Sequence, residues 1–338
     1  MSPSFAGRGG FGAARMFNQL WRRVNLKQID FEAQKPVQLL IAGPRGDEFV
    51  SVLAAAGPPL EGVLQRIEGP STAGSGSARA LIFCPAPEEN GASAKAPETS
   101  QPVFIVHVTS EDAGHHAKTS PPDHKPRAGA TAHYPLSAFT LAEMRKHVLP
   151  DLAHAYGDSQ IALAAQVPAF RSVVAARLTL DCAMNSLKVA AVSAVADHIP
   201  ILGLITGSIA SAGDTIAITA LQMRMLLRIA AAFGKKAEFA RIVELAPVVG
   251  GGYGWRALAR EASGFIPVAG IAIKAGIAYA GSLVVGQAAS YYYETGSHLP
   301  PHAVAAMYRE AGERAKDMVK NFATRGSRKH DPDQTSRR

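Results

Sequence analysis

Ile199–Met223 reads IPILGLITGSIASAGDTIAITALQM, and Ala262–Tyr293 reads ASGFIPVAGIAIKAGIAYAGSLVVGQAASYYY. Each stretch holds a single charged residue, Asp214 in the first and Lys274 in the second. Small residues recur at intervals of four, at Gly203, Gly207 and Ser211 and again at Ala272, Gly276 and Ala280. On a helix this spacing forms a stripe along which two backbones approach closely. The two stretches therefore predict tightly paired helices, either in lipid or in an alanine-rich soluble bundle.

The Gly213-Asp214 pair is expected to divide the first stretch, with Asp214 as the N-cap of a helix that Gly234 ends. The half before the break would have about 12 helical residues, or roughly 18 Å, whereas a hydrocarbon core is about 30 Å thick. The second stretch is long enough to span. In lipid, Asp214 and Lys274 would be costly unless they paired, so we expect them to lie near each other, or Lys274 to reach the surface.

The segment 224–261 between the two stretches carries seven Lys or Arg against three Glu. Two simple spans would put this basic segment outside, against the positive-inside rule. A re-entrant or in-leaflet helical hairpin avoids the conflict, and so does a fully soluble bundle. The sequence leaves both open.

The bulk composition favours an acidic partner. The 338 residues carry a net charge of +8 and are 47% hydrophobic but only 7% aromatic. A surface of anionic lipid fits this charge, whereas basic residues do not alternate with aromatic ones as a nucleic-acid surface would require. Cys84 and Cys182 are far apart and show no metal-type spacing, which favours a reducing cytoplasm.

The first half of the chain has the pattern of a small α/β domain. Apolar runs at 37–42, 78–83 and 103–108 predict strands of a parallel sheet, separated by helical segments and by long polar connectors at 70–78, 85–102 and 109–133. Before them, Phe17, Leu20, Trp21 and Val24 have helical spacing among basic residues, which predicts an amphipathic helix that lies on an anionic membrane or packs on the next domain. Thr140-Leu141-Ala142-Glu143 has the pattern of a capping box, and helices follow it.

Residues 149–295 resemble the YcjF-like domain, which is often joined to, or encoded beside, a GTPase of the Era type. The segments that carry the resemblance are Pro168-Ala169-Phe170-Arg171, Asn185, Ile199-Pro200, Gly213-Asp214 to Leu221-Gln222, Ile229-Ala230 to Gly234, Arg256-Ala257-Leu258, Ile266-Pro267 with Gly270, and Ala278-Tyr279-Ala280 to Gly286. The resemblance implies a bacterial protein at the cytoplasmic face of the inner membrane, with a GTPase as a partner, and it implies no chemistry for the domain.

With this resemblance, the turn after the first predicted strand becomes the candidate nucleotide loop. A GTPase needs Gly-x-x-x-x-Gly-Lys-Ser/Thr there, because the Lys meets the phosphates and the hydroxyl binds Mg²⁺. This chain has the shorter Gly43-Pro44-Arg45-Gly46-Asp47-Glu48, with two acids where the Lys and the hydroxyl should stand. We therefore predict a degenerate, non-catalytic loop made of Gly43, Arg45, Gly46, Asp47 and Glu48. An unrelated small α/β domain is the alternative.

These observations predict an α+β protein with four parts. They are a flexible segment with the basic helix (1–35), a degenerate P-loop-like α/β domain (36–138), a helical-hairpin domain with membrane-type apolar helices (139–323) and a disordered basic tail (324–338). The expected function is a membrane-associated scaffold or adaptor that is not an enzyme and needs no cofactor or metal. Its expected partners are anionic lipid, a GTPase and a second copy of the chain. A GTP-binding switch and a soluble helical interaction protein are the alternatives.

Overall fold

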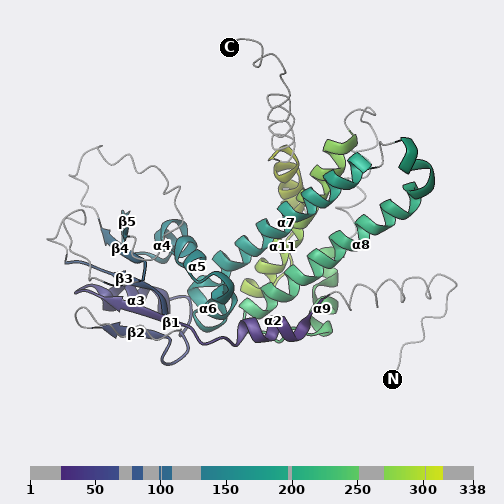
Figure 1. Cartoon of the computed structure of the whole chain (residues 1–338). Helices are drawn as coiled ribbons and strands as arrows, with labels where there is room; N and C mark the ends of the chain where they lie inside the picture. Colours follow the sequence, from purple (N-terminus) through teal and green to yellow (C-terminus); the bar gives the residue numbers. More distant parts are fainter. Residues whose placement is uncertain are drawn as a thin grey trace, which may run out of the picture. The chain divides into compact units, whose positions relative to one another are not determined.

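The computed structural model describes the backbone of residues 24–67, 78–86, 99, 101–108, 131–196, 200–250, 270–300 and 302–314. Within these ranges the chain forms an α+β structure of two compact units. The sheet unit comprises Leu26–Ala175 and Arg228–Ala237. The helical unit comprises residues 24–25, Ala176–Leu227 and the described residues after Ala237. Figure 1 shows the elements with their labels.

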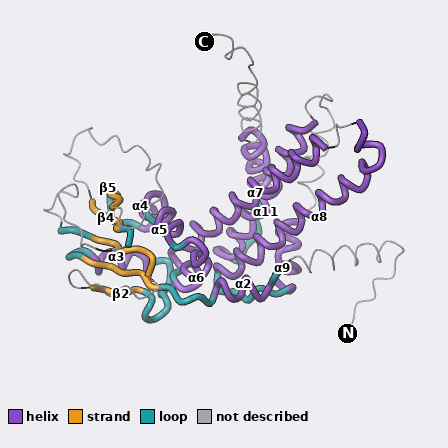
Figure 2. The backbone as a smooth tube through the Cα atoms, viewed as in Figure 1, coloured by secondary structure: helices purple, strands orange, loops and turns teal. Residues whose placement is uncertain are grey.

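The sheet unit is built on five parallel strands in the order β2-β1-β3-β4-β5. Figure 2 shows these strands in orange. They are β1 (Gln38–Ala42), β2 (Leu64–Ile67), β3 (Ala78–Phe83), β4 (Val103–Val108) and β5 (Thr131–Leu136). The predictions of β1, β3 and β4 are confirmed, because long runs of buried apolar residues mark strands covered on both faces. The sequence did not predict the two edge strands, and β5 begins inside the expected connector 109–133.

Short helices join and cover the strands. They are α2 (Leu26–Ala33), α3 (Gly46–Ala54), α4 (Leu141–His147), α5 (Leu149–Ala155) and α6 (Gln160–Gln166), with 3₁₀ turns at Gly157–Ser159 and Pro168–Phe170. The predicted N-cap is confirmed, since the Thr140 hydroxyl accepts a hydrogen bond from the Glu143 amide at 3.3 Å. The other half of the predicted box differs, because the Glu143 carboxylate accepts from the Ser137 amide.

The sheet unit extends well past residue 138, where the sequence analysis drew a boundary. The Tyr156 hydroxyl, at the end of α5, donates to the carbonyl of Gln38 in β1. The Tyr134 hydroxyl in β5 donates to the Asp151 carboxylate of α5 at 2.8 Å. These bonds, together with apolar packing of α4 and α5, join residues 139–175 to the sheet, so the division between the units falls inside a helix.

The helical unit contains most of α7 (Arg171–Ala196) and α8 (Pro200–Ala232), with α9 (Phe239–Gly250), α11 (Gly270–Thr295) and a helical segment at 302–314. Small side chains allow α7 and α11 to approach each other. The core of this contact consists of Ala183, Leu187, Ala190, Ala275, Ala278, Tyr279, Ala280 and Leu283. Gly234 ends α8 as predicted: its amide donates to the Ala231 carbonyl, and the Lys235 amide donates to the Ala230 carbonyl, both at 2.9 Å.

The predicted break at Gly213-Asp214 is wrong. The helix α8 runs without interruption for 33 residues, so Asp214 lies in its interior and is not an N-cap. A Gly and an Asp inside a helix together cost about 1.5 kcal/mol of propensity. A break would leave several backbone N–H and C=O groups without helical partners, at a cost of about 1–3 kcal/mol for each one buried unpaired. Continuing the helix is therefore favourable, and α8 has no separate half of about 12 residues before Gly213.

Among the described residues, none of the helices combines the length and the apolar character needed to cross a bilayer. The backbone through both charge-poor stretches is helical where it is described, but the side chains of residues 193–215 and of 246–274 are not described. The proposed pairing of Asp214 with Lys274, and the packing of Gly203, Gly207, Ser211 and Ala272, lie outside what the structure describes. The predicted amphipathic helix lies outside it as far as residue 23, and Val24, its last predicted apolar residue, is in a bend before α2. The tail at 324–338 also lies outside it.

Candidate functional site

The candidate site lies at the carboxyl ends of β1, β2 and β3. Strand β1 lies between β2 and β3 in the sheet. The chain therefore passes from β1 to its neighbour on one edge, β2, and then returns to its neighbour on the other edge, β3. In open parallel sheets, ligands bind outside the carboxyl ends of the strands where the order reverses in this way. In this protein that position lies between Gly43, which follows β1, and Cys84, which follows β3.

Backbone atoms fill the space between these two strand ends. The Cys84 amide donates to the Ala42 carbonyl at 2.9 Å, and the Arg45 amide donates to the Cys84 carbonyl at 3.3 Å. Gly43 has a φ of +93°, and a Cβ placed on it would lie 2.3 Å from the Cys84 carbonyl oxygen. Only glycine suits both this conformation and this close approach. The two loops therefore close on each other at the point where a ligand would enter.

The predicted loop residues Arg45, Asp47 and Glu48 come together in the turn and in the first turn of α3. The Arg45 guanidinium forms two hydrogen bonds with the Glu48 carboxylate, at 2.7 and 2.8 Å. The Asp47 carboxylate pairs with Arg66 of β2 at 2.9 Å. Carboxylates in the first turn of a helix interact favourably with its dipole, as a bound anion would. The helix end that could attract a phosphate therefore has two acids, each paired with an arginine.

Arg66 also defines the shape of the turn. Its Nη1 donates to the Gly43 carbonyl at 3.0 Å and lies 1.6 Å from where a Cβ on Gly46 would be. Arg45 in turn lies over the ring of Phe139, with 4.4 Å between the guanidinium carbon and the ring centroid. Arg66 and Phe139 were not predicted as part of this site. Arg66 could have been found from the sequence only if β2 had been recognised as an edge strand with polar residues on one face.

The buried thiol of Cys84 is a poor nucleophile. Its side chain has 0% exposure. Burial raises the pKa of the thiol from 9.0 to about 12, although Arg66 and Arg45 act in the opposite direction. The thiolate is the reactive form of cysteine, so its fraction at neutral pH falls about a thousandfold. Burial raises the pKa of Cys182 as well.

A second cluster of polar groups lies in the core of the helical unit. The Ser282 hydroxyl of α11 bonds with the Ser186 hydroxyl of α7 at 2.9 Å and accepts from the Gln222 amide of α8 at 3.1 Å. Four residues further along α11, Gly286 lies against Thr179 of α7, whose Oγ1 would be 2.2 Å from an added Cβ. Both serines have 0% exposure, so these bonds connect three helices away from water.

The stripe of small residues at this contact is Ala278, Ser282 and Gly286, which is offset by two positions from the predicted stripe. Of the predicted residues, Ala280 is buried in the same core and Gly276 is half-buried. The same spacing of four in the sequence could have identified the second stripe. These groups form hydrogen bonds and van der Waals contacts that align helices, and they have no nucleophile with an adjacent base.

Neither cluster resembles a metal site, since the described residues include no group of three or more His, Cys, Asp or Glu that could hold a metal ion. Two histidines, His107 and His133, lie on the adjacent strands β4 and β5. Burial lowers the pKa of His107, and His133 lowers it further. Comparison of the chain with models of protein families, with curated proteins and with solved structures found no match.

Proposed function

We propose that this protein is a non-catalytic scaffold or adaptor that works at a membrane surface. The observation that carries the non-catalytic part is the closed turn after β1. Glu48 and Asp47 of the turn are paired with Arg45 and with Arg66 of β2. The Cys84 backbone occupies the position between the strand ends. A ligand at this edge would have to displace both ion pairs and separate two backbone loops.

The chemistry of phosphate binding supports this proposal. A phosphate loop presents free backbone amides and an unpaired lysine to the nucleotide. In this turn the amide of Arg45 is bonded to Cys84, the amide of Gly46 is bonded to the carbonyl of Gly43 at 3.1 Å, and both arginine side chains have carboxylate partners. These two amides and both arginine side chains therefore already have partners within the protein.

The helical unit supports a scaffolding role. Helices α7, α8 and α11 are held by small residues in close contact and by bonds between buried hydroxyl and amide groups. Packing of this kind holds helices at fixed positions, so that their outer faces can present a constant surface to a partner. The net charge of +8 favours an anionic membrane as one partner. The resemblance of residues 149–295 makes a GTPase the class of protein partner that we propose.

Titration calorimetry with GTP and GDP in the presence of Mg²⁺ tests the non-catalytic part. We expect no binding heat from the full chain, with an active GTPase as the positive control. Binding at micromolar concentrations would contradict the proposal and favour a nucleotide-dependent switch.

Fractionation of cells that express the full chain tests the membrane part separately. We expect the protein in the membrane fraction, released by carbonate or by detergent. Recovery entirely in the soluble fraction would contradict membrane association and leave the soluble interaction protein as the better reading.

A further inference from the structure

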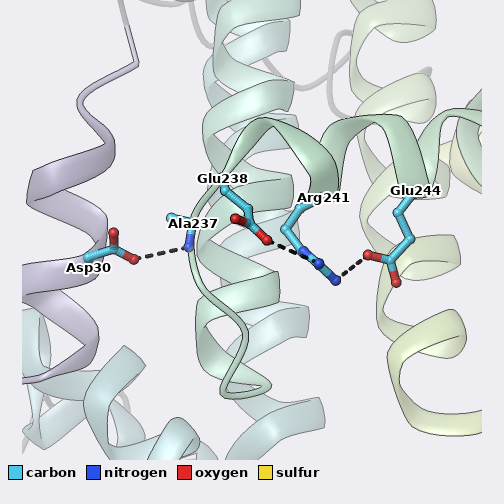
Figure 3. A network of polar contacts seen from close by, with 5 residues as sticks. All are labelled: Asp30, Ala237, Glu238, Arg241 and Glu244. Carbon is cyan, nitrogen blue, oxygen red and sulfur yellow. Dashed lines mark hydrogen bonds and ion pairs between the residues drawn. The ribbon is translucent and has the colours of Figure 1, made fainter. Parts of the chain in front are cut away.

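Helix α2 directs its acidic residues towards the rest of the sheet unit. The Asp30 carboxylate accepts a hydrogen bond from the Ala237 amide at 3.0 Å (Figure 3). The Glu32 carboxylate, 8% exposed, pairs with Arg228 at 3.2 Å and also accepts from the Gln28 side-chain amide. Ile29 is fully buried on the same side. Both carboxylates of this helix are therefore engaged within the protein.

The opposite side of α2 combines an exposed aromatic ring with two lysines. Phe31 is 67% exposed. Lys27 is exposed four residues before it, and the Lys35 Nζ, four residues after it, lies 5.8 Å from the centre of the Phe31 ring. Lys27 and Phe31 are four residues apart within α2 and lie on one side of it. Lys35 lies in the bend after α2, and its contact with the Phe31 ring brings its ammonium group to the same place. We call Lys27, Phe31 and Lys35 the outer face of α2. The inward position of Asp30 and Glu32 leaves this face with positive charge around an apolar centre.

We propose that the outer face of α2 binds the surface of a bilayer that contains anionic lipid. This inference rests on the proposed function and names the surface that performs its membrane contact. A phenylalanine ring gains free energy by entering the boundary between headgroups and acyl chains, and lysines beside it remain with the anionic headgroups. An exposed aromatic residue flanked by two ammonium groups, with no carboxylate of its own helix available, has the complementary charge and polarity for that boundary.

A vesicle sedimentation experiment with the full chain tests this assignment. We expect the wild-type protein to bind vesicles made of phosphatidylcholine and phosphatidylglycerol in equal amounts, and to bind phosphatidylcholine vesicles only weakly. High salt should release it, because exposed charges are screened. The variant Phe31→Ser and the double variant Lys27→Glu with Lys35→Glu should each bind about tenfold more weakly. Phe31 and Lys27 are exposed and Lys35 is half-buried in the bend after α2, so circular dichroism should show that the fold is retained.

Two variants in α7 provide matched controls. Leu180 is 47% exposed beside the exposed carboxylate Asp181, so Leu180→Ser removes a surface apolar side chain that lacks the paired lysines. Lys188→Glu reverses an exposed charge away from Phe31 in the sequence. Both controls should bind the anionic vesicles as the wild type does.

Three results would overturn the inference, and they have different consequences for the proposed function. Wild-type binding by both α2 variants would show that another surface meets the membrane, while the membrane function would stand. Absence of wild-type binding to both kinds of vesicle would count against the membrane function itself. A change in oligomeric state of Phe31→Ser without lipid, measured by sedimentation velocity, would show that the outer face of α2 is an interface between copies of the chain.

Discussion

In the turn after β1 and in the contact between α7 and α11, a glycine leaves room for a neighbouring side chain where its own Cβ would be. The neighbours that occupy this room differ. At Gly46 the neighbour is the guanidinium of Arg66, the end of a long and partly exposed side chain. At Gly286 it is Thr179, a β-branched residue with 2% exposure. A guanidinium can move aside, whereas a threonine on a packed helix has few alternatives. The contact at Gly46 therefore depends on a charged side chain that can rearrange, and the helical contact at Gly286 depends on a fixed shape.

The largest expected effect is that of Gly43→Ala, which perturbs the backbone of the turn and leaves its charged side chains unchanged. The new Cβ would meet the Cys84 carbonyl, and the φ of +93° is unfavourable for alanine. We expect a loss of about 3 kcal/mol in the free energy of unfolding, because backbone strain and overpacking add. Urea denaturation of the purified chain measures this loss.

Gly62→Ala is the matched control for that substitution. Gly62 also has a positive φ, +79°, but no atom lies within 4 Å of its would-be Cβ. We expect a loss of only about 1–2 kcal/mol from the backbone conformation. Equal losses at the two positions would show that the contact with Cys84 does not hold the turn closed.

Gly286→Ala is expected to cost about 1–2 kcal/mol. Overpacking against Thr179 outweighs the gain of up to about 1 kcal/mol that alanine brings to a helix. Thermal unfolding measures the loss, and Gly312→Ala is the control, since Gly312 is helical with open space around it and should gain stability. Adding Thr179→Ala removes the two closest atoms, so the double variant should lose less than the sum of the single losses. Strict additivity would contradict the proposed contact.

The sequence predicted the interior of the sheet and missed its edges, for a physical reason. β1, β3 and β4 are buried on both faces and consist largely of apolar residues. β2 is exposed at Gln65 and Arg66, and β5 contains Pro135, which is tolerated only at an edge where no ladder bond is lost. Edge strands do not need an apolar run, so neither showed the pattern by which the others were found.

Only the part of the candidate site that consists of neighbouring residues in the sequence could be predicted. Arg45, Asp47 and Glu48 are neighbours in sequence, and the mismatch with a phosphate loop was visible there. Their partners Arg66 and Cys84 come from two other strands, and only the order of the strands brings them to the turn. In the same way, the spacing of small residues predicted close helix packing, but it could not choose between the two stripes on α11.

Alkaline pH should lower the free energy of unfolding of the sheet unit, because of the Cys84 thiol. The decrease should be at most about 1.4 kcal/mol per pH unit. The folded pKa of this thiol is about 12, against an ordinary value of 9.0. Between these values the unfolded chain releases the proton while the folded chain keeps it, so stability falls as pH rises above 9.0 and is unaffected below it.

Urea denaturation below and above pH 9.0, on the wild type and on Cys84→Ala, measures this contribution. The variant should lose less stability across that range. Some fall should remain, because burial also raises the pKa of Tyr134 and Tyr156. The same fall in both proteins would mean that the Cys84 thiol is accessible to solvent in the folded state.

Gly46→Ala should have the smallest effect, although its added Cβ would have the closer contact of the two. It would lie 1.6 Å from the nearest atom, against 2.2 Å for a Cβ at Gly286. The Arg66 guanidinium can swing into solvent and lose a largely exposed pair with Asp47, which is worth about 0.2–1 kcal/mol. Alanine in the first turn of α3 returns a few tenths of a kcal/mol in helix propensity, so the net change should stay within about 0.5 kcal/mol. In an Arg66→Ala background the clash is absent, and Gly46→Ala should then be neutral or stabilising. A loss at Gly46 larger than the loss at Gly286 would show that the Arg66 side chain is held as rigidly in the turn as Thr179 is in the helical contact.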